Sequence, residues 1–229
     1  MSLDAPSEGS PPVRSRDDLV AWLRAGEKPA SRHRCGLETE KLGAFADTGR
    51  PAPLVGDRSI ARVLERMAAA SGGRLLVEQG VPIGIQLANA SVALEPGGQL
   101  ELSGAPAFTL AESAEEVASH LSLSRRFGDE VGIAWVACGY RPWGPRSEVP
   151  WLPRGRYGLM RAKLPGRLAH DMMQMTASVQ ANFDFSDEAD LAAKVSTATA
   201  VSPLVAALFS NSPLVEGRPS GFKSFRYRV

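Results

Sequence analysis

The sequence has few of the features that mark secreted, membrane-spanning or nucleic-acid-binding proteins. Its 229 residues include only two cysteines, Cys35 and Cys138, so we expect reduced thiols rather than a disulfide framework or a four-thiolate zinc site. Lysine and arginine number 26 against 25 aspartates and glutamates, and a net charge of +1 gives no overall field to attract nucleic acid or an anionic membrane. The sequence has no run of about eighteen apolar residues that would predict a membrane span. Its first thirty residues contain no apolar segment that would predict a signal peptide. We therefore expect a cytoplasmic protein that binds neither nucleic acid nor membrane.

Several common catalytic motifs are also absent. The chain contains neither a Walker A sequence nor G-x-G-x-x-G, so it has no glycine loop to hold phosphate at the start of a helix. It lacks G-x-S-x-G, and its histidines are scattered and form no H-E-x-x-H. The chemistry must therefore come from another arrangement of polar residues.

The length suits one large domain or two small ones, and the pattern of short strands favours antiparallel hairpins over βαβ units. Residues 1–16 are polar and rich in proline, and we expect a flexible lead-in there. Apolar periodicity and capping signals predict helices at 17–26, 60–70, 109–127, 156–164, 167–172 and from a cap at Ser186 to just before Pro203. We expect strands at 34–45, 74–79, 83–87, 91–95, 99–103, 133–139 and 175–185, an ordered surface loop at 140–153, and the start of a further strand at 225–229.

The strongest signal is a set of carboxylates that recur at every second residue of predicted strands. Glu38 and Glu40 share one face of the first strand, about 7 Å apart, where they repel each other unless a cation lies between them. If Pro96–Gly98 form a hairpin loop, Glu95 and Glu101 share a face with Gln99, and aliphatic residues occupy the other face. The alternative is the solvated side of an antiparallel sheet. Carboxylate oxygens in this number favour Mg²⁺ or Mn²⁺ over zinc.

A third polar face runs along residues 176–184, where Thr, Ser, Gln, Asn and Asp alternate with apolar residues. Such alternation predicts a strand, and its polar face is either a solvated surface or part of the same site. Basic residues that could neutralise a phosphoryl group near the acids are Lys41, Arg156, Arg161, Lys223, Arg226 and Arg228. Each of these has a second interpretation as an ordinary surface charge.

Five segments resemble glutamate-cysteine ligase of the plant and proteobacterial type. They are GLETEKLG at 36–43, LEPGGQLELSGAP at 94–106, RGRYGLM at 154–160, the stretch from Met172 through SVQANFD at 178–184, and FSNSP at 209–213 with EG at 216–217. The similarity extends in unbroken order from about His33 to the last residue. Residues 17–229 are thereby identified as the N-terminal portion of such a catalytic domain.

The resemblance implies an α+β, glutamine synthetase-like fold, in which a curved antiparallel sheet carries the site on its concave face and helices cover its convex face. It implies that ATP phosphorylates the γ-carboxylate of L-glutamate and that the amine of L-cysteine then displaces phosphate, giving γ-glutamylcysteine for glutathione synthesis.

The resemblance also assigns roles to individual residues. The implied metal ligands for Mg²⁺ or Mn²⁺ are Glu38, Glu40, Glu95 and Glu101. Gln180 and Asn182 would contact the nucleotide or its metal-bound phosphates. Arg226 and Lys41 are the implied catalytic cations, and the implied amino-acid pocket comprises Arg156, Tyr157, Met160 and Met175.

The chain departs from the family pattern in three places. Leu42 stands where an aromatic residue is usual, Tyr227 replaces a serine after Arg226, and family members continue well beyond Arg226, so we expect a sheet that is incomplete at its C-terminal end. Two other hypotheses follow: an inactive homologue that acts as a binding or partner subunit, and a different Mg-ATP phosphotransferase on the same fold. Nothing in the sequence pairs Cys35 with Cys138, and the oligomeric state stays open.

Overall fold

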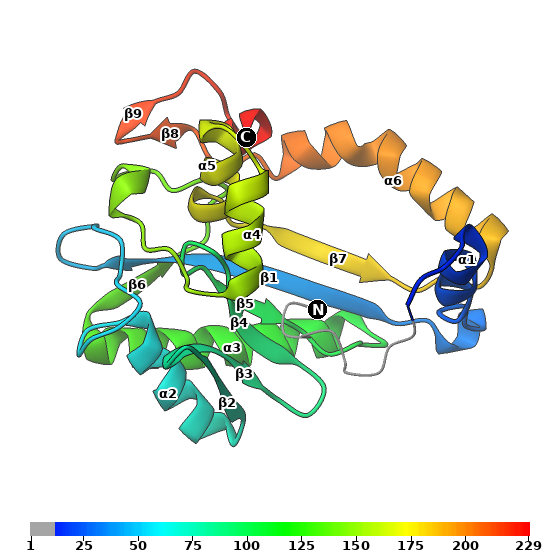
Figure 1. Cartoon of the computed structure of the whole chain (residues 1–229), viewed down its shortest axis with the longest axis horizontal. Coiled ribbons are helices and arrows are strands. Elements are labelled where there is room, and N and C mark those ends of the chain that lie inside the picture. The colour runs from blue at the N-terminus through cyan, green and yellow to red at the C-terminus, as the bar shows by residue number, and fades with distance from the viewer. Residues whose placement is uncertain (1–11) are drawn as a thin grey trace.

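The computed structural model describes residues 12–229, so most of the predicted lead-in lies outside the described residues. The chain is α+β, as predicted (Figure 1). Its helices are α1 (Arg16–Arg24), α2 (Ile60–Ser71), α3 (Leu110–Val131), α4 (Gly155–Lys163), α5 (Arg167–Met175) and α6 (Glu188–Leu208), with short 3-10 turns at Ala30–Arg32 (η1), Arg146–Glu148 (η2) and Phe225–Arg228 (η3).

One antiparallel sheet forms the centre of the protein. Its strands are β1 (Cys35–Phe45), β2 (Arg74–Glu78), β3 (Val81–Gln86), β4 (Ser91–Leu94), β5 (Leu100–Ser103), β6 (Ile133–Val136) and β7 (Val179–Phe183). The order is β2-β3-β4-β5-β1-β6, and β7 pairs with the first half of β1. β8 (Leu214–Val215) and β9 (Arg218–Pro219) form a separate small hairpin. The long strand β1 therefore holds β5 along one edge and both β6 and β7 along the other.

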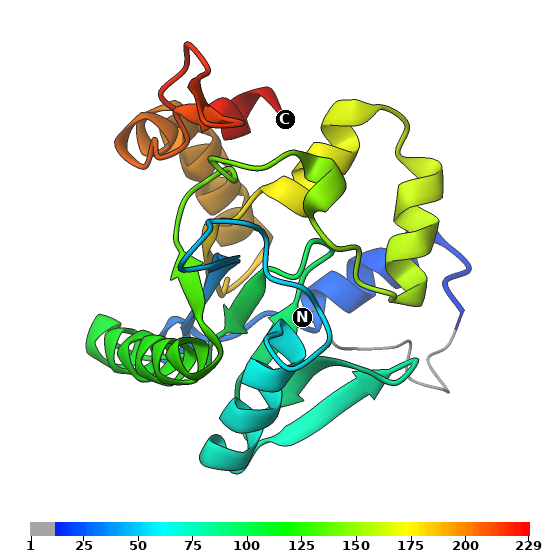
Figure 2. The same ribbon diagram turned by 90° about the vertical axis from the view of Figure 1, so that its left-hand side faces the viewer.

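The core lies between this sheet and the helices α2 and α3. α2 buries Ile60, Val63, Leu64 and Met67, which recur at three- and four-residue intervals. They belong to the same apolar cluster as Val92, Leu94, Leu100 and Leu102, which is the aliphatic face predicted for the β4–β5 hairpin. α4 and α5 lie on the other side of the sheet (Figure 2). The sheet is thus covered by α2 and α3 on the face opposite the predicted acids.

Local signals set several helix boundaries correctly. Thr109 caps α3, its hydroxyl accepts from the backbone N–H of Glu112, and the Glu112 carboxylate accepts from the backbone N–H of Thr109, so the predicted capping box is confirmed. Gly72 ends α2 with a positive φ of 68°, a conformation that glycine adopts without strain. Ser15 caps α1, which begins at Arg16, inside the segment expected to be flexible.

Several boundary predictions are wrong, including the end of α3, which lies at Val131 rather than residue 127. α5 continues to Met175, so the strand expected from residue 175 begins only at Val179. The strand expected at 133–139 ends at Val136. Asp187 rather than Ser186 caps α6, and the two neighbouring residues are both good caps. α6 also continues through Pro203, because the alanine- and leucine-rich residues around it favour helix strongly enough to offset one lost hydrogen bond.

Residues 225–228 form a 3-10 turn that Val229 follows, and not the start of a strand. Phe225 packs edge-to-face on Tyr140, with ring centroids 5.0 Å apart, and its backbone N–H donates to the carbonyl of Ser212. Tyr227 and Val229 then donate to carbonyls three residues earlier. The side chains are alternately apolar, as in a strand, but local hydrogen bonds and the contact with Tyr140 determine the backbone.

α6 stands apart from the rest of the fold. It is apolar on all sides, and none of its residues is buried within the described structure. It is the one helix among residues 12–229 whose length and composition would suit a membrane span, although no such run was expected from the sequence. Helices of soluble proteins pass the same test, so this finding is weak support for a membrane segment.

Candidate functional site

The predicted acids meet on one face of the sheet. Glu40 of β1 lies directly opposite Glu101 of β5, and Glu101 lies opposite Ala93 of β4. The backbone N–H of Glu95 donates to the carbonyl of Gln99, which closes the hairpin in the predicted register. The side chains of Glu40, Glu95 and Glu101 therefore converge although they come from two distant segments of the chain. We call these three residues the acid cluster.

β7 extends this polar face on the other side of β1. Gln180 pairs with Glu38 in the strand register, and Asn182 donates through Nδ2 to Glu38 Oε1 at 3.0 Å. The backbone N–H of Ser178 donates to Glu40 Oε2 at 2.8 Å. The two amides predicted to contact a nucleotide thus lie beside Glu38, next to the acid cluster. β7 is exposed along its whole length, so ligands can reach these amides from solvent.

The acid cluster is crowded with negative charge. Burial, followed by the charge of Glu95, raises the pKa of Glu40 to about 7, although the Ser178 N–H and Arg226 act in the opposite direction. Burial, a hydrogen bond with the Glu95 carboxyl and its charge raise the pKa of Glu101 to about 8. The Ser103 hydroxyl donates to Glu101 Oε1 at 3.1 Å and only partly compensates. Near neutral pH the cluster must therefore hold a proton or bind a cation.

Cationic and hydroxyl groups surround these acids. Arg226 lies close enough to Glu40 to lower its pKa, and its backbone N–H donates to Ser212 Oγ at 3.2 Å, which ties the C-terminal segment to the site. On the other side, Arg156 Nη2 donates to the Tyr157 hydroxyl at 2.9 Å and lies 3.9 Å from Glu95 Oε1. The Tyr157 hydroxyl also donates to Glu95 Oε1 at 3.2 Å. Arg156, Tyr157 and Arg226 are therefore brought together with the acids, as the sequence predicted.

Lys41 does not lie on this face, contrary to the prediction that it acts beside the acids. It follows Glu40 in β1 and so points to the opposite face, toward α3, where it is buried. Its ammonium donates to Thr39 Oγ1 at 3.1 Å, and burial lowers its pKa to about 8. A single step along a strand reverses the face, and this alternation separates Lys41 from the acid cluster.

The two predicted pocket methionines differ in their exposure. Met160 is 38% exposed on α4, whereas Met175 is buried in a small second core with Tyr140 and Val149. Of the other basic residues, Arg161 stacks on the Trp151 ring, 4.8 Å from its centroid, and Arg228 lies over Phe222 at 5.3 Å. These contacts give Met175, Arg161 and Arg228 packing partners of their own.

Gln99 has a structural role that the sequence reasoning did not assign. Its buried side chain accepts from the backbone N–H of Gly97 at 2.8 Å and donates to the carbonyls of Met173 at 3.0 Å and Thr176 at 2.8 Å. These bonds fasten the hairpin that carries Glu95 and Glu101 to the end of α5. Gly97 fits because a Cβ there would collide with the carbonyl of Gln174. The adjacent glycines of the EPGGQ segment were a signal for this close approach.

The chemistry of the acid cluster fits a hard divalent cation, although it does not enclose one. In the described part of the chain, no three His, Cys, Asp or Glu side chains are arranged to hold a metal ion by themselves. Mg²⁺ is commonly bound by one or two carboxylates, with water and substrate phosphates completing its shell. Burial, followed by the neighbouring Glu95 carboxyl, raises the pKa values of Glu40 and Glu101, and a bound cation would favour the ionised form of both. Cys35 and Cys138 are free thiols and are not paired with each other.

Comparison with known proteins shows the family of this chain. The model of glutamate-cysteine ligase family 2 (GCS2) matches residues 34–229. The chain is 41% identical over 217 residues to glutamate-cysteine ligase A, chloroplastic, of Oryza sativa subsp. japonica, covering 94% of this chain and 44% of that protein. It is also 41% identical to the chloroplastic glutamate-cysteine ligase of Arabidopsis thaliana, covering 94% of this chain and 41% of that protein.

The segments that carry the acid cluster lie inside the matched region, and the chain spans less than half the length of these relatives. The identity exceeds what chance produces over sequences of this length. The match includes β1, the β4–β5 hairpin, β7 and Arg226. The chain belongs to glutamate-cysteine ligase family 2.

Proposed function

We propose that this chain carries the acid face of an ATP-dependent ligase that joins L-cysteine to the γ-carboxylate of L-glutamate. A γ-carboxylate oxygen would attack the γ-phosphorus of ATP, giving γ-glutamyl phosphate and ADP. The amine of cysteine would then attack the acyl carbon, and phosphate and a proton would leave as the amide bond of γ-glutamylcysteine forms. This product is the first intermediate of glutathione synthesis. The observation that carries the proposal is the convergence of Glu40, Glu95 and Glu101 beside Arg226 in a member of this family.

The residues of the acid face would have different roles according to their side-chain chemistry. Glu40, Glu95 and Glu101 would hold Mg²⁺ or Mn²⁺, with Glu38 at the margin. Such a cation neutralises phosphate charge and aligns the transferring group when it is bound. Arg226 is placed to stabilise negative charge on the glutamate carboxylate or the acyl phosphate. Gln180 and Asn182 offer amide donors to phosphate or nucleotide, and Arg156 and Tyr157 orient Glu95.

A second candidate is a binding or partner subunit without ligase activity. The chain spans 41–44% of the length of the relatives described above, so activity of these residues alone has to be measured. Without ligase activity the acid cluster would still bind a divalent cation and nucleotide, but no product would form. The sequence-based proposal of a cytoplasmic location applies to either candidate, whereas the plant relatives carry the description chloroplastic.

The decisive experiment measures ADP release by the purified chain as a function of L-glutamate and L-cysteine. Ligase activity requires that release depends on Mg²⁺ and on both amino acids, and that Glu101→Gln abolishes it. Glu130→Gln, an exposed carboxylate at the end of α3, serves as the matched control and should leave the rate unchanged. Binding of Mg-ATP without turnover in folded protein would reject the ligase proposal and support the second candidate.

A further inference from the structure

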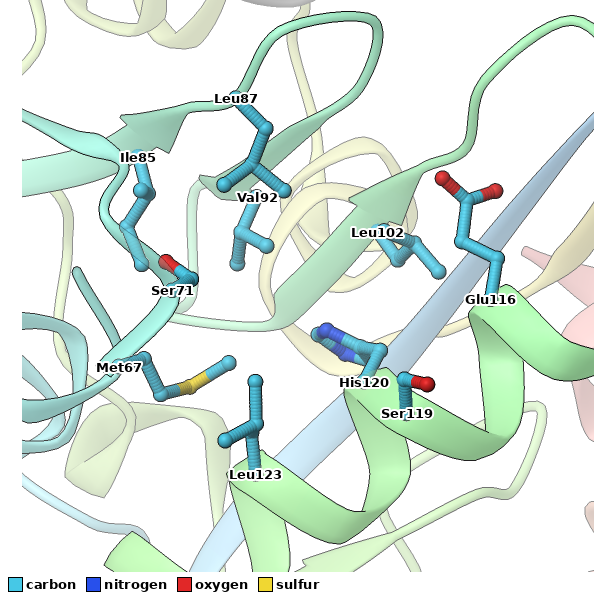
Figure 3. Close-up of a pocket in the computed structure, with 10 residues that line it drawn as sticks. All are labelled: Met67, Ser71, Ile85, Leu87, Val92, Leu102, Glu116, Ser119, His120 and Leu123. Atoms are coloured by element: carbon cyan, nitrogen blue, oxygen red, sulfur yellow. The ribbon is translucent and has the colours of Figure 1, made fainter.

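A cavity of about 120 Å³ lies between the helical layer and the sheet, on the face away from the acid cluster (Figure 3). Its lining comes from α2, α3 and the strands β3, β4 and β5, with contributions from the adjoining turns. The residues that bound its centre are Met67, Ile85, Val92, Leu102, His120 and Leu123. The space is therefore separate from the proposed ligase site and backs on the strand that carries Glu101.

The cavity is apolar except for one buried nitrogen. His120 is 5% exposed, and its Nε2 has no hydrogen-bond partner among the described residues. Figure 3 shows the imidazole extending from α3 toward the sheet, whereas the oxygens of Ser119 and Glu116 point away from the centre. The Glu116 carboxylate accepts from the backbone N–H of Ala105 at 3.0 Å and so has its own partner. An unmade bond at a buried nitrogen costs about 1–3 kcal/mol, which a bound molecule would recover.

A water molecule suits this space poorly. Buried waters make about three hydrogen bonds, and the accessible surface of this lining is almost entirely apolar. Engineered apolar cavities of about 150 Å³ stay dry and bind benzene. The volume and the lining of this cavity therefore match a small organic molecule with one polar group better than they match solvent.

The charge state of His120 restricts that polar group. Burial, followed by the charge of Lys41, lowers the pKa of His120 to about 3, so the ring is neutral at physiological pH. In a neutral ring each nitrogen is either a donor or an acceptor, and a hydroxyl matches both cases. A charged ligand would lose its hydration in this lining, where Lys41 is not among the lining residues and the Glu116 carboxylate already accepts from Ala105.

We propose that this cavity is a binding site for a small neutral molecule of about the size of benzene that carries one hydroxyl group, which hydrogen-bonds to His120 Nε2. The site does not depend on the ligase function proposed above. Leu102 lines the cavity and is the neighbour of Glu101 in β5. A bound molecule would therefore contact β5 on the face opposite the acid cluster.

Phenol and benzene are the probes for this site, with binding to the whole chain measured by calorimetry and by the shift in Tm. Phenol should bind and raise the Tm, with an affinity at least roughly fivefold above that of benzene because of the additional hydrogen bond. His120→Leu should remove this preference. Leu123→Phe should fill the cavity and abolish binding of both probes, whereas Leu121→Phe, at a 45% exposed position of the same helix, should not.

Two results would overturn the proposal. One is the absence of phenol binding to the folded wild-type chain at millimolar concentration. The other is phenol binding without nuclear Overhauser contacts to the methyl groups of Ile85, Leu102 and Leu123. The second measurement uses the wild-type protein, so it decides the question even where a cavity-filling variant does not fold.

Discussion

Replacing Gln99 by methionine isolates the connection between the acid hairpin and α5. Methionine has nearly the same length and volume as glutamine but can neither donate nor accept the three hydrogen bonds. The backbone N–H of Gly97 and the carbonyls of Met173 and Thr176 would each lose a partner. Because Gln99 is only 2% exposed, water cannot readily replace these bonds.

The expected loss of stability follows from the groups left unpaired. An unsatisfied buried donor or acceptor costs about 1–3 kcal/mol, and the apolar side chain of methionine recovers part of this. We expect Gln99→Met to lower the free energy of unfolding by about 3 kcal/mol, a large share of the roughly 5–15 kcal/mol typical of a domain. The turn between Glu95 and Glu101 would also lose its attachment to the end of α5, so Mn²⁺ affinity should fall as well.

Gln86 provides a matched control. Its Nε2 donates to the carbonyls of Leu87 at 2.9 Å and Ala90 at 3.3 Å, in the turn between β3 and β4. It is half-buried, and water can replace these bonds in the variant, so Gln86→Met should cost about 1 kcal/mol or less and leave Mn²⁺ affinity unchanged. Urea unfolding followed by circular dichroism measures both variants. Equal destabilisation by the two substitutions would refute the role assigned to Gln99.

Three further predictions address the acids, α6 and a helix cap. Glu101 has a pKa of about 8 in the folded chain against 4.5 when unfolded, so its stabilising contribution is complete below pH 4.5 and is lost as pH rises through 8. Urea titrations at pH 4.5 and pH 8 without metal should show wild type losing about 2 kcal/mol more than Glu101→Gln, and an equal loss would contradict the crowding of the acids. Leu204 and Leu208 are 71% and 80% exposed on α6, so we expect the chain to self-associate through this helix in analytical ultracentrifugation and the double change to glutamate to reduce that association; a monomeric wild type or unchanged association would contradict this. Thr109→Ala should cost about 1 kcal/mol by removing the cap of α3, a loss visible as a lower Tm, and Thr109→Ser should restore it.

The strands of the site were predictable because alternation is a local property. Glu38 and Glu40 share a face, and the register of the β4–β5 hairpin follows from Pro96–Gly98, so the pairing of Ala93 with Glu101 was correct. The same rule shows why Lys41 cannot join the acids, since it is the next residue after Glu40. Treating Lys41 as an acid-side cation overlooked this alternation.

Other features depend on contacts that no local pattern contains. The role of Gln99 arises from contacts with a distant segment, and the 3-10 turn at Phe225–Arg228 combines local hydrogen bonds with the contact between Phe225 and Tyr140. Tyr140 holds Phe225, and the carbonyls of Met173 and Thr176 hold Gln99. The sequence around Gln99 does not show whether its side-chain amide bonds to distant carbonyls or faces solvent.

The sequence by itself determined the antiparallel hairpins and the acid face, because strand periodicity and hairpin geometry act over a few residues, and its motifs resemble the family that the comparisons show. Only the tertiary structure decided that Glu40, Glu95 and Glu101 crowd one another beside Arg226, and that Lys41 is buried near His120 behind them. The physical reason is that burial and Coulomb interaction depend on distances between segments far apart in the chain. Those distances fix which carboxylates hold protons and which need a cation.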